Sequence, residues 1–141
     1  MVDRERVLGK LDELNRYVEE LRAIAPRSFE AYLRVETKRA CERLLQISVE
    51  AVIDICHLLV AGLRLGVPAD EAALFDTLAR RGAISEGLAR TLKEMKGFRN
   101  ILVHEYAAVD DAVVYKAVRD RLADFEAFRR EALQILDRSA R

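Results

Sequence analysis

Arg43 to Leu59 reads RLLQISVEAVIDICHLL, and this stretch decides the fold. Nearly every position outside one polar line is aliphatic, a pattern typical of a helix that is buried over most of its surface. A glycine and a proline shortly after Leu63 indicate where the helix stops. We therefore predict a long central helix that begins at Ser28 or Glu36 and ends at Leu63.

The rest of the chain shows the same helical periodicity, with no strand-like alternation. Only 2 Pro and 6 Gly also favour helices over a turn-rich β fold. The predicted fold class is all-α, an antiparallel helical bundle of four long helices plus one short helix, in a single domain over residues 1–141. Besides the central helix, we expect helices over residues 3–25 and 70–80 (the short one), from Ser85 or Glu86, and from Asp110 or Asp111 to the end.

The charge balance limits the partners that the chain could have. Its formal net charge is zero, whereas a sequence-blind coat for nucleic acid would carry a strong positive excess, so contact with RNA must be local and no DNA partner is expected. No uncharged run reaches about 18 residues, and no apolar leader opens the sequence. We expect a cytoplasmic protein without a membrane partner, in which Cys41 and Cys56 are reduced and buried.

The densest group of chemically active side chains is FRNILVHEY, from Phe98 to Tyr106. It contains an R-x4-H-x-Y pattern made of Arg99, His104 and Tyr106, with Asn100 beside the arginine. In a straight helix Arg99 and His104 would lie about 140° apart, so they converge only if the helix ends or bends near Val103. The stretch HEYAAVDD, with a new cap at Asp110 or Asp111, indicates such an ending. The alternative is a helix end at which Arg and His simply meet the last carbonyls and the negative end of the dipole.

A polar line runs along the central helix and includes Gln46, Glu50, Asp54 and His57. Because its flanks are aliphatic, we expect these four to face a cleft or an interface, with Asp54 or Glu50 paired to Arg99. The alternative is that the polar line is simply the solvent-exposed face of an amphipathic helix. Asp54 and His57, with Glu50 one turn before, could form half of a metal site. A di-iron bundle would need a Glu-x-x-His on each of two helices, and no second helix carries such a motif, so no metal or other cofactor is expected.

With FRNILVHEYAAVDD before its last helix and RLLQISVEAVIDICHLL in the second, the chain resembles the HEPN domain, in particular the HepT-like toxins of toxin–antitoxin pairs. The resemblance implies a HEPN-type bundle, a metal-independent endoribonuclease and a homodimer within a larger hetero-oligomer. It also implies a cognate minimal nucleotidyltransferase antitoxin that transfers AMP to Tyr106. The alternatives are a non-catalytic HEPN module that binds a nucleotidyltransferase or a nucleotide, and an unrelated structural bundle.

Chemistry assigns roles within the motif. RNA cleavage by its own 2′-hydroxyl needs proton transfer near neutral pH, which suits His104, and a cation on the phosphate, which suits Arg99. Asn100 could orient the phosphate or the imidazole, and two copies of His104 in a dimer would supply both an acid and a base. A ridge of positive charge beside the motif could follow an RNA backbone or simply face solvent. It consists of Arg90, Lys93, Lys96 and Arg99.

Overall fold

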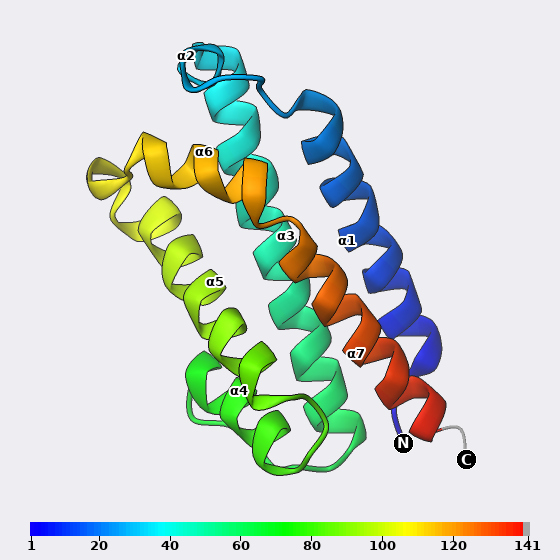
Figure 1. Ribbon diagram of the computed structural model, residues 1–141. Helices are drawn as coiled ribbons and strands as arrows, with labels where there is room; N and C mark the ends of the chain where they lie inside the picture. The colour runs from blue at the N-terminus through cyan, green and yellow to red at the C-terminus, as the bar shows by residue number, and fades with distance from the viewer. Residues whose placement is uncertain (140–141) are drawn as a thin grey trace.

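The computed structural model describes residues 1–139, and Figure 1 shows helices stacked around a long central one. Within this range there is no strand, which confirms the predicted all-α class. Three of the four predicted long helices form single helices and the fourth is divided in two, so the described residues contain three short α-helices and one 3-10 turn where a single short helix was expected. The elements are α1 (Arg4–Ile24), α2 (Phe29–Tyr32), α3 (Val35–Gly62), α4 (Glu71–Arg80), α5 (Glu86–His104), η1 (Tyr106–Ala108), α6 (Asp111–Asp120) and α7 (Ala123–Ser139).

Helix α3 is the centre of the bundle and contacts α1, α2, α4, α5 and α6 (Figure 1). It contributes twelve buried residues, among them both cysteines, which are free thiols. By length and composition α3 would also be able to cross a membrane, but 56% of that apolar window is buried inside the bundle, as in the core helix of a globular protein. The decisive stretch of the sequence therefore forms the core, as expected from its aliphatic character.

Helix starts follow local capping chemistry. Ser28, Asp70, Ser85 and Asp110 each accept a hydrogen bond from a backbone N–H in the first turn of the helix that follows. Two starts were predicted for the second helix, Ser28 and Glu36. Ser28 caps the short α2, and Glu36 is the second residue of α3, which begins separately at Val35. The predicted caps are confirmed because a cap depends only on residues three or four positions apart.

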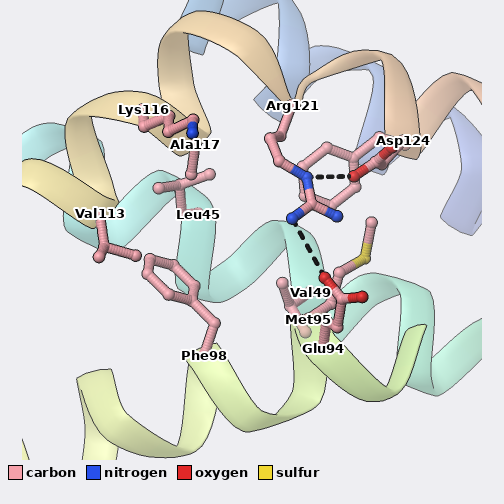
Figure 2. A pocket seen from close by; sticks show the side chains of 11 residues that line it. Leu45, Val49, Glu94, Met95, Phe98, Val113, Lys116, Ala117, Arg121 and Asp124 are labelled. Atoms are coloured by element: carbon pink, nitrogen blue, oxygen red, sulfur yellow. Dashed lines mark hydrogen bonds and ion pairs between the residues drawn. The ribbon is translucent and has the colours of Figure 1, made fainter. Parts of the chain in front are cut away.

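The last predicted helix is wrong as one piece, because the chain bends at Arg121 and forms α6 and α7. Neither glycine nor proline marks the bend. Figure 2 shows the Arg121 guanidinium between two carboxylates, donating to Asp124 at 2.9 Å and to Glu94 of α5 at 3.1 Å. The bend lets α6 cross the bundle while its buried stripe, Val114 and Val118, stays continuous with that of α7.

Candidate functional site

The R-x4-H-x-Y motif spans the end of α5 and the turn after it. Arg99 and Asn100 lie in the last part of the helix, His104 is its final residue, and Tyr106 opens η1. The Glu105 N–H closes the helix by donating to the Ile101 carbonyl at 3.1 Å. This termination places three side chains of different chemistry within one short segment.

The expected convergence of Arg99 and His104 does not occur within one chain. Helical backbone continues through His104, so no bend separates the two residues. The two side chains therefore leave the helix about 140° apart. In residues 1–139 no hydrogen bond or ion pair involves the exposed imidazole of His104. A single chain presents the arginine and the histidine in different directions.

Arg99 is the centre of what we call the arginine cluster, together with Asn100, Glu71 and Glu50. Its side chain is only 14% exposed, and Nη2 lies 2.5 Å from Glu71 Oε1 of α4. Nη1 lies 3.8 Å from Glu50 Oε2 of α3, and Nε donates to Asn100 Oδ1 at 3.0 Å. Carboxylates from two helices thus hold the planar guanidinium in one orientation.

The polar line of α3 divides into two parts. Gln46 and Glu50 belong to the motif side, since Gln46 Nε2 donates to Glu50 Oε2 at 3.3 Å. Asp54, by contrast, does not reach Arg99: its carboxylate is 56% exposed and lies 3.6 Å from Lys10 Nζ of α1. His57 is exposed one turn further. The pairing of Arg99 expected for Asp54 or Glu50 is therefore found for Glu50 alone, at ion-pair distance, because Asp54 turns toward α1.

Tyr106 belongs to a second group, which we call the tyrosine cluster: Tyr106, Glu42 and Arg39. The Tyr106 hydroxyl donates to Glu42 Oε1 at 2.7 Å and accepts from Arg39 Nη1. Arg39 also pairs with Glu42 Oε1 at 3.0 Å, and its guanidinium lies 5.4 Å from the centre of the Tyr106 ring. Burial, followed by the hydrogen bond to the Glu42 carboxylate, raises the pKa of Tyr106.

Sequence reasoning missed Glu42, which is buried to 6% relative exposure. Its second oxygen, Oε2, has no hydrogen-bond partner within residues 1–139. The available signal was its position: Glu42 lies about 40° beyond Gln46 around the helix, on the flank where Cys41 and Leu45 are buried. A carboxylate on an apolar flank needs a partner, and here the partner is Tyr106.

The tyrosine cluster opens onto a pocket of about 300 Å³. Its lining consists of Arg39, Glu42, Arg43, Gln46, Leu102 and Tyr106. A separate pocket of about 390 Å³ lies between α3, α5 and the α6–α7 bend, and Figure 2 shows the largely apolar side chains Leu45, Val49, Met95, Phe98 and Val113 around it. No residue of the R-x4-H-x-Y motif lines this larger hollow, and Tyr106 is the motif residue that lines the smaller one.

The positively charged ridge on α5 is half neutralised by α4. Lys93 Nζ lies 2.5 Å from Asp76, and Arg99 pairs with Glu71. Arg90 and Lys96 are left without an ion pair in the part of the chain that the structure describes. These two remain available for phosphate contacts. In residues 1–139 no three His, Cys, Asp or Glu side chains gather closely enough to hold a metal ion.

Comparisons with known proteins were made on the sequence and on the fold. The family model described as ribonuclease HepT-like matches residues 14–132. The mRNA nuclease HepT of Shewanella oneidensis is 38% identical over 84 residues, which are 60% of this chain and 63% of that protein. The tRNA nuclease HepT of Aphanizomenon flos-aquae is 29% identical over 123 residues, covering 86% of this chain and 84% of the relative.

The fold comparison agrees with the sequence comparison. The tri-AMPylated Shewanella oneidensis HEPN toxin, solved in complex with its MNT antitoxin, superimposes with a TM-score of 0.82 at 26% identity. The superposition covers 93% of this chain and 96% of the toxin. Since the family model covers most of the chain, from within α1 into α7, the chain belongs to the ribonuclease HepT-like family.

Proposed function

We propose that this chain is an RNA endonuclease and the toxin of a cytoplasmic toxin–antitoxin pair, with a minimal nucleotidyltransferase as its antitoxin. Family membership and the nuclease names of the relatives support this class of activity. The observation that carries the proposal is the contrast at the end of α5, where Arg99 is held between carboxylates with 14% of its side chain exposed and His104 is exposed without a partner in residues 1–139. These are the two groups that RNA cleavage without a metal requires.

The proposed reaction is a transfer of phosphate within the RNA. The 2′-oxygen bonds to phosphorus and the bond to the 5′-oxygen breaks, while one proton leaves the 2′-hydroxyl and another reaches the leaving oxygen. An imidazole with a pKa near neutrality suits both proton transfers. Arg99 binds the phosphate oxygens as charge develops, and Asn100 fixes the orientation of the guanidinium through Nε.

A homodimer would complete the site. One His104 cannot act as acid and base in the same step, and within a chain it points away from Arg99. Two-fold symmetry would place two copies of the motif together. Random mixing of wild-type and His104→Ala subunits tests this. If both histidines are needed, an equal mixture should keep about a quarter of the wild-type rate, whereas about half would remain if each histidine worked alone.

Transfer of AMP to Tyr106 is the proposed means of neutralisation. Tyr106 is 47% exposed on the turn after α5, within reach of a modifying enzyme. The attached nucleotide would add bulk and negative charge two residues from His104, and would compete with RNA for the arginines. Incubation with the partner and ATP should add AMP to wild type and to Tyr115→Phe, but none to Tyr106→Phe, as measured by intact mass. AMP on Tyr106→Phe would contradict the assignment.

Cleavage of total RNA by the purified chain, with EDTA present, tests the activity itself. His104→Ala should lower the rate about 100-fold or more. His57→Ala is the matched control, because His57 is the other of the chain's 2 histidines and is exposed on α3, about 10 Å along the helix beyond Glu50. Loss of cleavage in EDTA, or an active His104→Ala protein, would contradict the mechanism.

A further inference from the structure

Glu42 is a buried carboxylate that the RNA-cleaving mechanism does not use. One oxygen accepts from the Tyr106 hydroxyl and from Arg39, and the other has no partner within residues 1–139. Burial of a charged group is costly unless hydrogen bonds compensate. An ordinary core position would hold an apolar residue, as the positions of Cys41 and Leu45 do on the same flank. The position of the carboxylate is therefore tied to the hydroxyl that it contacts.

The chemistry of the Tyr106 hydroxyl explains what such a contact could supply. A phenol becomes a good nucleophile only when its proton is removed, and burial together with the Glu42 hydrogen bond raises the pKa of Tyr106 above its ordinary value. Little phenolate would therefore exist near neutral pH without a base. A general base has to lie within about 2.6–3.2 Å of the oxygen that it deprotonates. Glu42 Oε1 lies at 2.7 Å.

We propose that Glu42 accepts the proton of the Tyr106 hydroxyl as this oxygen attacks the α-phosphorus of ATP, and that Arg39 binds the phosphodiester so formed. The inference rests on the proposed transfer of AMP to Tyr106. The Tyr106 oxygen–phosphorus bond forms, the bond between the α-phosphorus and the bridging oxygen breaks, and pyrophosphate leaves. The phenolic proton ends on the Glu42 carboxylate, so the step is balanced.

Arg39 is placed to act both before and after the transfer of AMP. Before transfer it contacts the Tyr106 oxygen and the Glu42 carboxylate. Once Glu42 is protonated, its side chain is neutral and the ion pair with Arg39 is lost, so the new phosphodiester becomes the negative group on Tyr106 that the guanidinium can bind. Arg43 lines the same pocket, whose volume of about 300 Å³ leaves room beside the hydroxyl. The pocket can therefore retain the modified side chain.

The test measures single-turnover AMP transfer to the full chain, with saturating nucleotidyltransferase, ATP and magnesium, followed by intact mass. Glu42→Gln keeps the shape of the side chain and should slow the transfer about 100-fold. Arg39→Gln should slow it about tenfold, and Arg39→Lys should recover part of that loss because it keeps the charge but not the planar fork. Glu36 is an exposed carboxylate on the first turn of α3, so Glu36→Gln is the matched control and should react as wild type.

A pH profile distinguishes a base from a merely structural residue. Without Glu42, only phenolate produced by solvent reacts, so the Glu42→Gln rate should rise about tenfold per pH unit, while the wild-type rate rises less steeply. Ribonuclease activity and helicity of Glu42→Gln report on folding and should stay close to wild type. Equal rates for wild type and Glu42→Gln, or slower transfer with an unchanged profile, would overturn the role of Glu42. A wild-type chain that takes no AMP on Tyr106 would instead overturn the modification itself.

Discussion

The arginine cluster and the tyrosine cluster lie on either side of the end of α5, and both depend on a carboxylate of α3. Glu50 serves the first and Glu42 the second, eight positions or about 12 Å apart along the helix. Arg99 is nearly enclosed between α3 and α4, with 14% of its side chain exposed, whereas Tyr106 is 47% exposed and its hydroxyl contacts Glu42 and Arg39. His104 stands between Arg99 and Tyr106 in the sequence, and its side chain is exposed.

This difference separates two requirements of the proposed site. A group that stabilises charge works best when its orientation is fixed in advance, and the carboxylates around Arg99 fix it. A side chain that exchanges protons with RNA or accepts a nucleotide has to be reachable, which His104 and Tyr106 are. The same helix end meets both requirements because successive motif residues leave it in different directions.

Removing the centre of the arginine cluster should have the largest effect on RNA cleavage. Arg99→Ala should lower the rate about 100-fold or more, because no other cation in the cluster binds the phosphate. Arg99→Lys should recover only part of it, since an ammonium lacks the two-pronged geometry. Single-turnover cleavage of a defined RNA measures both. Cleavage by Arg99→Ala within a few-fold of wild type would show that the enclosed arginine is purely structural.

The partners of Arg99 should matter in the order of their distances. Glu71→Gln loosens the contact at 2.5 Å and should reduce cleavage about tenfold, whereas Glu50→Gln, at 3.8 Å, should reduce it less. Glu86→Gln, at the exposed start of α5, is the control. A larger effect from Glu50 than from Glu71 would mean that α3, not α4, orients the guanidinium during the reaction.

In the tyrosine cluster, loss of the hydroxyl should cost stability. Tyr106→Phe removes a hydrogen bond from the buried Glu42 carboxylate, so the free energy of unfolding should fall by about 1 kcal/mol. Tyr115→Phe is matched in chemistry, but its hydroxyl accepts from the exposed Arg119. We expect no measurable change there. Urea unfolding followed by circular dichroism compares the two variants. Equal losses of stability would contradict the prediction that the Tyr106 hydroxyl stabilises the buried Glu42 carboxylate.

The smallest expected effect is on titration at high pH. Because the pKa of Tyr106 is raised in the folded chain, its contribution to stability is complete below the ordinary tyrosine pKa of 10.0 and is lost as the pH rises through the raised value. Glu42→Gln removes the nearby charge, so Tyr106 should ionise at lower pH. Ultraviolet absorbance of phenolate, taken as the difference from Tyr106→Phe in each background, measures this. An unchanged or higher pKa would contradict the contact.

Part of the site was accessible from sequence. The motif stands at the end of a helix, and Glu50 belongs to its surroundings, because a narrow polar strip on an aliphatic helix has to meet polar partners. Asp54 satisfies the same pattern but turns to Lys10 of α1. Helical periodicity gives the face of a side chain to within a wide angle, and it does not say which of two neighbouring helices that face meets.

Sequence alone determined the helical class, three of the four long helices and the caps at Ser28, Asp70, Ser85 and Asp110, because periodicity and capping depend on residues no more than a few positions apart. Only the tertiary structure decided that Glu71 orients Arg99, that Glu42 holds Tyr106 and that the chain bends at Arg121. These contacts join residues 28, 64 and 27 positions apart. They depend on how the helices pack around α3, and a local sequence pattern cannot predict a contact between side chains that are far apart in the sequence.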